Sequence, residues 1–403
     1  MLERYEKFLS EERLDELRYR GNRLSDAKIL TVNAAKDGGG VAQILKSLIS
    51  LLRDVGIDID WEVIEADESF FDITKRFHNG LQGENIELSD EEAQRYKDIN
   101  HSFWTSVEHD YDFFLIHDPQ PCALIDEITS KPAVIRLHID LSTPNSTAWE
   151  FLQPYITAYD EAILSKQTYY HEDLSMDHRI IHPATDPFTP INEEMDHDQA
   201  QRMVQKRTGP TDHLITQVSR YDKWKDPVGV IDVFEAVRAE KQCSLLLLGS
   251  DAEDDPEGQE IYERVKERKA QSTYSDDITV VMENNAELVN AAQRVSDVIV
   301  QKSLREGFGL TVSEAMLKGT PVVASNVGGI PCQISHGDNG FLHEPRNHEA
   351  FAKTIHNLLD DREMKHLVGS RAVKSVKDDF LMTRLLDQYL SLFEDYLLTP
   401  GPV

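Results

Sequence analysis

The chain has 403 residues, of which 40% are apolar and 28% charged, as in a globular protein with room for two cores of about 150 to 200 residues each. Its 72 Asp and Glu outnumber its 42 Lys and Arg, which gives a formal net charge of −30. That charge repels phosphate backbones and anionic lipid, so nucleic acid and membrane surfaces are excluded as general partners. A bound anion therefore needs a local cluster of donors. The acidity fits a salt-rich cytoplasm and an ordinary one equally well.

The N-terminal segment alternates charged and apolar residues at helical spacing, so we expect neither a signal peptide nor an anchor. No run of about 18 apolar residues occurs in the sequence. Cys122, Cys243 and Cys332 are far apart and lack a Cys-x-x-Cys spacing, which argues against disulfides and a zinc site. We expect a reduced, cytoplasmic protein.

Short apolar runs alternate with longer helical patterns, which is typical of parallel sheets covered by helices on both faces. The sequence therefore predicts an α/β protein with two Rossmann-like domains. In the N-terminal half the expected strands are 28–33, 60–65, 113–117, 134–138, 162–165 and 179–182. In the C-terminal half they begin at residues 214, 244, 278, 297, 321 and 340.

Residues 183–194 contain three prolines, and proline fixes φ and removes a backbone donor. We interpret this segment as a stiff linker between an N-terminal domain, 1–186, and a C-terminal domain, 193–380. The amphipathic stretch 381–399 has no strand after it. It could cap the second sheet or cross back to the first domain, and we group it with the first.

In parallel α/β sheets, ligands bind at the carboxyl ends of strands, where helix N-termini offer free N–H groups. One such loop carries Gly38, Gly39 and Gly40 directly before an apolar helical pattern. Glycine lets the backbone approach a phosphate or a sugar hydroxyl closely, although a plain strand-to-helix turn has the same pattern. Gln43 stands where the dinucleotide fingerprint needs its third glycine, which weighs against a nicotinamide oxidoreductase.

A second loop follows the strand that begins at residue 214 and carries Arg220 and Lys225 just before a helix. A fork-shaped guanidinium beside a point charge suits two adjacent phosphates. A solvated basic loop is the plainer alternative. In a chain this acidic, the pair indicates an anion site.

The loop after the strand that begins at residue 297 gives the strongest signal. Glu306 precedes Gly307 and Gly309, which allow a sharp turn. The backbone N–H groups of Leu310 and Thr311 then start a helix, and Glu314 follows about two helical turns after Glu306. The two carboxylates would bracket a diphosphate bound by the amides between them. A capped surface helix with an incidental glutamate does not explain the first carboxylate and the glycines. The residues concerned are Glu306, Gly307, Phe308, Gly309, Leu310, Thr311 and Glu314.

The run 306–314 resembles the Glu-x7-Glu element of retaining GT-B glycosyltransferases of family 4, and Ser219-Arg220 with Lys225 is similar to that family's donor-phosphate pair. The resemblance covers nearly the whole chain and implies two Rossmann-like domains facing across a cleft. One branch, the archaeal and bacterial trehalose glycosyltransferring synthases, which are related to the retaining trehalose phosphorylases, is the most similar. The segments that resemble this branch are TKRFHNGLQG at 74–83, HDPQP at 117–121, RLHIDLSTPN at 136–145 and DDPEG at 254–258.

The resemblance implies a donor site in the second domain. Arg220 and Lys225 would neutralise the donor diphosphate, with the amides of the turn at 307–311 between the carboxylates. Glu314 would bind the ribose hydroxyls, and Glu306 would hold hydroxyls of the transferred hexose. Backbone groups of the segment VMENNA, after the strand at 278, would contact the nucleobase of the donor.

In the first domain the resemblance implies that His138 contacts the same hexose near the reacting carbon, and that Gly39 and Gly40 form the facing loop. Asp118 would lie on the acceptor side, although an Asp-Pro pair after a strand is more often a cap or turn. Arg136, on the same strand face as His138, would serve the acceptor or the hexose. An ordinary hydrogen-bonded histidine is the plainer interpretation of His138.

A retaining transfer by double displacement needs two carboxylates about 5 to 5.5 Å apart. Glu306 in a loop and Glu314 on the helix beyond it do not suit that role, so we favour front-face displacement, in which the leaving phosphate takes the acceptor proton. Glucose would move between UDP- or ADP-glucose and glucose, which makes or breaks trehalose.

Three other functions stay open: a trehalose phosphorylase using phosphate and glucose 1-phosphate, a family 4 transferase with another acceptor, and a non-catalytic sugar-nucleotide sensor. Two Asp-x-Asp pairs, at 58–60 and 110–112, match the signature of metal-dependent GT-A enzymes. We expect both pairs to lie before strands and to match the signature by chance. We expect no bound metal or cofactor, and any effect of Mg²⁺ to act through the substrate's diphosphate. The expected partners are sugars and a nucleotide sugar, and the resembling branch suggests a homodimer.

Overall fold

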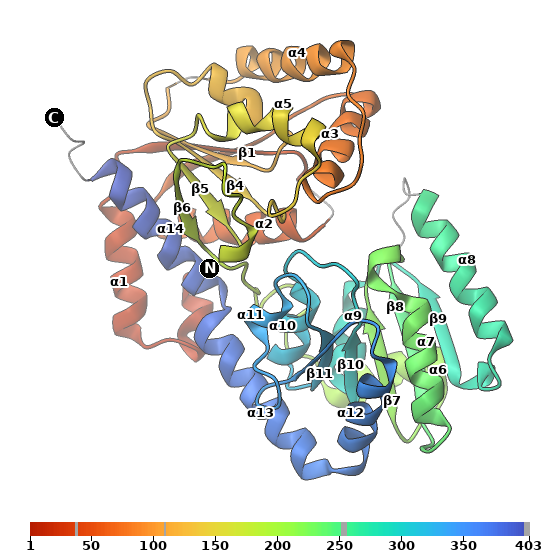
Figure 1. Ribbon diagram of the computed structural model, residues 1–403. Coiled ribbons are helices and arrows are strands. Elements are labelled where there is room, and N and C mark those ends of the chain that lie inside the picture. Colours follow the sequence, from red (N-terminus) through yellow and green to blue (C-terminus); the bar gives the residue numbers. More distant parts are fainter. Residues whose placement is uncertain (37–38, 109, 251–255, 399–403) are drawn as a thin grey trace. The chain divides into compact units, whose positions relative to one another are not determined.

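The structure is a computed structural model that describes residues 1–36, 39–108, 110–250 and 256–398 (Figure 1). The chain divides into two compact units. Unit 1 comprises Met1–Ala184 and Met382–Val403, and unit 2 comprises Thr185–Leu381. Each unit contains a six-stranded parallel sheet with helices packed against it. The expected α/β architecture with two Rossmann-like sheets is confirmed.

The sheet of unit 1 has the strand order β2-β1-β3-β4-β5-β6, and each of its pairings is parallel. Its central strands are buried at every residue, which explains their continuous apolar sequences, because helices cover both faces. The order reverses between β1 and β3, and ligands of such sheets bind at the carboxyl ends of the strands at that reversal. The strands are β1 (Lys28–Asn33), β2 (Asp58–Val63), β3 (Phe113–His117), β4 (Ala133–Leu137), β5 (Glu161–Leu164) and β6 (Asp177–Ile180).

The helices of unit 1 begin where the sequence supplies capping side chains. Ser89 and Glu92 form a reciprocal capping box at the start of α4, and Asp67 caps α3. A cluster of aromatic rings, including Phe77 and Tyr96, fills the space between α3, α4 and α5. The helices are α1 (Glu11–Asn22), α2 (Gly39–Asp54), α3 (Glu68–Leu81), α4 (Asp90–Ser106), α5 (Ser146–Ile156) and α14 (Met382–Leu397), with short 3-10 turns at Leu2–Lys7, Cys122–Asp126 and Gln167–Tyr169.

The C-terminal helix α14 belongs to unit 1, although it follows unit 2 in the sequence. It packs against α1 and α2, and Figure 1 shows it in blue beside the red α1. The ring of Phe393 lies 5.3 Å from that of Phe113 on β3, measured between centroids. Arg384 donates hydrogen bonds of 2.8 Å to the carbonyl oxygens of His182 and Pro183. The last helix therefore completes the core of the first unit.

The sheet of unit 2 has the order β12-β11-β10-β7-β8-β9 and is also parallel in each pairing. Its order reverses between β10 and β7, so the loops after these two strands meet at the ligand-binding edge. The strands are β7 (Leu214–Val218), β8 (Ser244–Gly249), β9 (Ile278–Met282), β10 (Val298–Gln301), β11 (Val322–Ser325) and β12 (Phe341–His343). The helices are α6 (His197–Thr208), α7 (Pro227–Arg238), α8 (Pro256–Gln271), α9 (Ala286–Val295), α10 (Leu310–Leu317), α11 (Ile330–Gln333), α12 (His348–Asp360) and α13 (Arg362–Asp379), with short 3-10 turns at Lys223–Lys225 and Ser275–Asp277.

Most of the proline-containing segment that we interpreted as a linker packs within unit 2. The backbone N–H of Thr185 donates to Phe380 O at 2.7 Å, and Asn192 is buried and accepts from the ammonium of Lys318 at 2.7 Å. The prolines therefore shape the start of unit 2. None of the helices in the described ranges combines the length and the apolar character that crossing a bilayer requires.

We predict that Phe393→Ala lowers the free energy of unfolding by about 3 to 5 kcal/mol, because it leaves a cavity between α14 and the sheet of unit 1. Chemical denaturation followed by circular dichroism measures this change. Tyr19→Ala, at a side chain that is 66% exposed on α1, serves as the control and should change stability by less than about 0.5 kcal/mol. Equal effects of the two variants would contradict the packing of α14 into the core.

Candidate active site

In unit 2, the loops after β7 and β10 are joined by an ion pair between Lys225 and Glu306. The Lys225 Nζ lies 2.6 Å from Glu306 Oε2, and both side chains are largely buried. The same carboxylate oxygen accepts from Gln301 Nε2 at 3.2 Å and from Ser303 Oγ at 3.1 Å. An ammonium has three N–H donors, and this contact uses one of them. The ion pair therefore fixes where the ammonium of Lys225 lies without exhausting its capacity to bind an anion.

Arg220 lies on the same loop as Lys225 but has a different environment. Its side chain is 62% exposed, and its Nη2 is 3.6 Å from Asp222 Oδ2. Asp222 also accepts from the backbone N–H of Trp224 at 2.7 Å, which holds the start of the short 3-10 turn before α7. The loop thus presents one exposed guanidinium and one ammonium fixed by a carboxylate.

A second ion pair, which the sequence analysis missed, lies beneath this loop. Lys302 is fully buried, and its Nζ pairs with Asp226 Oδ2. Asp226 has a φ of 47° and caps α7 by accepting from the backbone N–H of Gly229 at 3.1 Å. A Cβ at Gly229 would collide with this carboxylate, so only glycine leaves room for the pair. Leu304 N also donates to Trp224 O at 2.7 Å, and the two loops are therefore interlocked.

The glycine turn before α10 depends on one of its two glycines for its backbone conformation. Gly309 has a φ of 81°, a left-handed value that favours glycine, and it occupies the position before α10. Gly307 is not among the residues with positive φ, and its carbonyl accepts from Gly329 N at 2.8 Å. Leu310 and Thr311 are the first two residues of α10, where backbone N–H groups have no acceptor inside the helix. Gln333 Nε2 holds the carbonyl of Phe308 at 2.6 Å.

Glu314 lies in the second turn of α10 and is buried. Burial raises the pKa of its carboxyl group, while the nearby Lys318 ammonium and a hydrogen bond from Gln293 act in the opposite direction. Gln293 Nε2 lies 3.4 Å from Glu314 Oε2, and Lys318 Nζ donates to the carbonyl oxygen of Glu314 at 3.1 Å. Glu306 and Glu314 therefore have separate partners and different environments. The assignment of Glu314 to a ribose stays a prediction.

In unit 1, the loops after β1 and β3 occupy the reversal of strand order. Gly39 and Gly40 are the first two residues of α2 and are exposed, and Gly39 has a φ of 69°. Gly38 lies outside the described residues. Asp118 follows β3 with a φ of 64°, and its Oδ1 accepts from the backbone N–H of His138 at 2.8 Å. Burial raises the pKa of Asp118 to about 7.

His138 lies after β4, beside a second histidine at the end of β3. The Nε2 of His138 is 3.2 Å from the Nδ1 of His117, and the two rings are stacked with centroids 5.5 Å apart. The Nε2 of His117 is 3.1 Å from Thr31 Oγ1 on β1. Burial, together with the charge of Arg136, lowers the pKa of His117 to about 3 and holds that of His138 well below its usual range. Both rings are therefore neutral at pH 7.

Arg136 is 1% exposed and lies on β4 among these side chains. Its Nη2 is 3.4 Å from Ser165 Oγ, while its Nε and Nη1 are buried without a hydrogen-bond partner among the described residues. The guanidinium thus faces the interior. The assignment of Arg136 to the acceptor or the hexose stays a prediction. Its charge also lowers the pKa values of the neighbouring His117 and His138, after the larger effect of burial.

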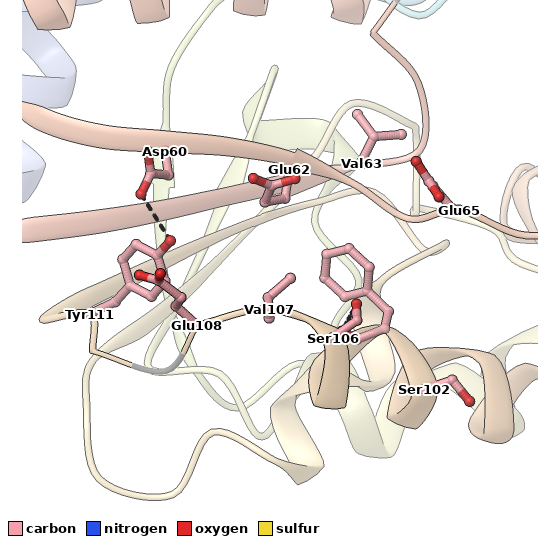
Figure 2. A pocket seen from close by; sticks show the side chains of 10 residues that line it. Asp60, Glu62, Val63, Glu65, Ser102, Ser106, Val107, Glu108 and Tyr111 are labelled. Atoms are coloured by element: carbon pink, nitrogen blue, oxygen red, sulfur yellow. Dashed lines mark hydrogen bonds between the residues drawn. The ribbon is translucent and has the colours of Figure 1, made fainter.

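A pocket elsewhere in unit 1 has a volume of about 610 Å³ and lies between β2 and the end of α4 (Figure 2). It contains several carboxylates, and the hydroxyl of Tyr111 donates to Asp60 Oδ2 at 2.9 Å. Such a lining repels a diphosphate, so this pocket is not a donor site. Its residues are Asp60, Glu62, Val63, Glu65, Ser102, Phe103, Ser106, Val107, Glu108 and Tyr111.

The two Asp-x-Asp pairs have different positions relative to their strands. Asp58 and Asp60 lie within β2, where we had expected them before the strand. Asp112 precedes β3 and pairs with Lys131 at 2.8 Å. In the described ranges, no three acidic, histidine or cysteine side chains form a group able to hold a metal ion.

The two sheets, each with glycine-containing loops at the reversal of its strand order, define the GT-B class of glycosyltransferases. A model of the trehalose synthase N-terminal domain matches residues 31–171, and one of glycosyl transferases group 1 matches residues 198–375. The trehalose synthase of Thermococcus litoralis is 39% identical over 401 residues, which cover 98% of this chain and 97% of that protein. The chain belongs to the trehalose synthase family of glycosyltransferases.

Two further likenesses are more distant. The trehalose phosphorylase of Pleurotus pulmonarius is 28% identical over 87% of this chain and 55% of that protein. A UDP-forming trehalose-phosphate synthase from Burkholderia xenovorans superposes with a TM-score of 0.73 at 14% identity, over 93% of this chain and 100% of that chain. The second likeness shows the fold alone.

The structure brings together residues that the sequence analysis did not single out. Lys302 could have been found because a lysine directly after an apolar strand is unusual. Asp226 could have been found because an Asp-Pro pair often starts a helix. His117 stood in the HDPQP segment, but its spacing to other histidines gave no signal. Thr31 lies inside an apolar strand, and nothing in the sequence marks it.

We predict that Lys302→Met lowers the free energy of unfolding by about 3 kcal/mol, because it leaves the carboxylate of Asp226 without its buried counter-charge. Urea denaturation measures the change. The double variant Lys302→Met/Asp226→Asn, which keeps an oxygen to cap α7, should recover part of the loss. If the two substitutions are instead simply additive, Lys302 and Asp226 do not interact.

Proposed function

We propose that this enzyme transfers glucose with retention between a nucleoside diphosphate glucose, UDP- or ADP-glucose, and free glucose, and so makes or breaks trehalose. The observation that carries the proposal is the contact of Lys225 with Glu306 ahead of the N-terminus of α10. It places a cation and a carboxylate beside free helix amides, which suits a diphosphate attached to a sugar. The identity to trehalose synthases along the whole chain supports the substrate.

Within unit 2, Lys225 and Arg220 neutralise the leaving diphosphate, and the amides of Leu310 and Thr311 bind its oxygens. Glu306 accepts hydrogen bonds from hexose hydroxyls, and Glu314 accepts them from the ribose. The exposure of Arg220 leaves its guanidinium accessible to an anion. Charge that grows on the diphosphate is thus stabilised by groups already in place, which is the largest contribution in many enzymes.

Within unit 1, His138 contacts the hexose near the reacting carbon, the amides of Gly39 and Gly40 face the donor, and Asp118 serves the acceptor. The bond from the anomeric carbon to the diphosphate oxygen breaks while a bond to the acceptor hydroxyl forms on the same face. The acceptor proton passes to the departing phosphate oxygen. Glu306 and Glu314 have separate partners, which supports this route over one with a carboxylate pair.

A trehalose phosphorylase is the second candidate, favoured by the similarity to the Pleurotus enzyme. It would use inorganic phosphate in place of the nucleoside diphosphate at the same cations. The higher identity to the trehalose synthase of Thermococcus litoralis, 39% against 28%, supports the synthase over the phosphorylase. This chain spans about half the length of the Pleurotus enzyme. We further propose that the enzyme needs no bound cofactor, that Mg²⁺ acts only through the diphosphate, and that the protein works as a cytoplasmic homodimer.

Incubation with trehalose and UDP, ADP or phosphate in turn tests the proposal. Formation of a sugar nucleotide with equimolar free glucose supports it, and NMR of the anomeric proton reports retention. Glucose 1-phosphate formed from phosphate alone would favour the phosphorylase. Absence of turnover with every one of the three would contradict both candidates.

We predict that Lys225→Ala lowers kcat by about 10²- to 10³-fold, because it removes a preorganised charge from the leaving group. Arg220→Ala should act in the same direction and keep its melting temperature within a few degrees, whereas Lys225→Ala should also lower the melting temperature, because it leaves the carboxylate of Glu306 without its counter-charge. Lys223→Ala changes the same charge on the same loop at an exposed position and should keep near-normal rates. Equal rates of Lys223→Ala and Lys225→Ala would contradict the phosphate assignment.

A further inference from the structure

A continuous chain of hydrogen bonds crosses three strands of unit 1 and ends at His138. The hydroxyl of Thr31 on β1 lies 3.2 Å from the carbonyl oxygen of Leu115 on β3. The same Oγ1 lies 3.1 Å from His117 Nε2, and His117 Nδ1 lies 3.2 Å from His138 Nε2. Thr31 and His117 are buried, and His138 is half-buried.

The carbonyl at one end of this chain sets the direction of every hydrogen bond in it. A carbonyl oxygen only accepts, and we assign the single hydroxyl proton of Thr31 to the hydrogen bond with Leu115 O. Thr31 Oγ1 then accepts from His117 Nε2–H. A neutral imidazole has one N–H, so His117 Nδ1 is an acceptor and receives the proton of His138 Nε2–H. The Nδ1 of His138 is left as the acceptor of that ring.

This argument requires both imidazoles to be neutral, and their surroundings provide for that. His117 is buried and His138 half-buried, and the buried guanidinium of Arg136 beside them has two nitrogens that have no hydrogen-bond partner among the described residues. A positive charge of this kind, poorly screened in a low-dielectric interior, opposes a second one on either ring. Asp118, also beside them, accepts from the backbone N–H of His138, and burial raises the pKa of its carboxyl group to about 7, which reduces its negative charge at pH 7.

We propose that His117 and Thr31 are positioning residues that hold His138 in its Nε2–H tautomer, so that His138 Nδ1 accepts a hydrogen bond from a substrate hydroxyl. Neither positioning residue touches the substrate. The opposite tautomer of His138 would leave two unprotonated nitrogens, His138 Nε2 and His117 Nδ1, facing each other without a proton between them. The chain from Leu115 keeps His117 from supplying that proton.

The inference rests on the proposed contact of His138 with the transferred hexose, but its first test does not depend on activity. In protein labelled with ¹⁵N-histidine, long-range ¹⁵N–¹H correlation distinguishes protonated from unprotonated ring nitrogens. At pH 7 we expect His138 to show a protonated Nε2 and an unprotonated Nδ1, with signals assigned by their loss in His138→Gln. A protonated Nδ1 on His138 in the unmodified protein would overturn the proposal.

Two substitutions at position 117 test the positioning role. His117→Leu removes the acceptor for His138 Nε2–H and should mix the two tautomers of His138. It should also lower kcat for glucosyl transfer by about ten- to a hundredfold, with little change in KM for the nucleoside diphosphate. His117→Asn keeps an oxygen near the position of Nδ1 and should restore the Nε2–H tautomer together with most of the rate.

Thr31→Val and Thr31→Ser form a second pair in case the leucine variant does not fold. The valine variant removes the hydroxyl that orders the chain, and the serine variant keeps it. If tautomer and rate change together in the His117→Leu and Thr31→Val proteins and recover together in the conservative variants, the proposal holds. If the leucine and asparagine variants lose activity equally while His138 keeps its tautomer, His117 has a structural role only and the proposal is wrong.

If the unmodified enzyme shows no glucosyl transfer, the proposed function fails. The tautomer measurement on His138 still decides whether the hydrogen-bond chain is correct. If transfer is found but His138 has the opposite tautomer, this inference alone fails. The two failures are therefore distinguishable.

Discussion

Two ion pairs in unit 2 hold together the loops that carry the proposed donor site. The largely buried Lys225 and Glu306 form one pair, and the fully buried Lys302 forms the other with Asp226. Removing either partner of such a pair leaves a charge with poor access to water, which costs more than the pair itself contributes. The arrangement therefore fixes the loops after β7 and β10 as one body. A cationic binding site in a chain with a net charge of −30 depends on this local order.

The two units differ in how their buried charged groups are paired. In unit 2, an ammonium and a carboxylate are paired in the loops where we propose that an anion binds. In unit 1, two nitrogens of the Arg136 guanidinium have no hydrogen-bond partner among the described residues, and burial together with this positive charge lowers the pKa values of two histidines. Both units also place an aspartate with positive φ in the loop after a central strand, Asp118 with φ 64° and Asp226 with φ 47°. Strained backbone of this kind is typical of functional loops.

Much of the fold could be predicted from the sequence, because buried parallel strands give continuous apolar runs and each expected run became a strand within two residues of its predicted start. The glycine turn and the charged residues of unit 2 could also be predicted, since they lie in the loops that follow strands. The contacts among them could not. Lys302 pairs with a residue 76 positions away, and the link from Thr31 to His117 spans 86, so only the folded sheet brings them together. The burial of Arg136 on β4 could not be predicted either, because an arginine is seldom fully buried.

The position of α14 has a consequence for biosynthesis. Unit 2 is an insertion within unit 1, since the chain enters it at Thr185 and leaves it at Leu381, two residues that pair side by side. Domains generally fold in the order in which the ribosome produces them, from the N-terminus onward. Here the first unit emerges without the helix that covers Phe113, and the inserted unit is complete before that helix is synthesised. Synthesis of unit 1 thus begins before that of unit 2 and is completed after it.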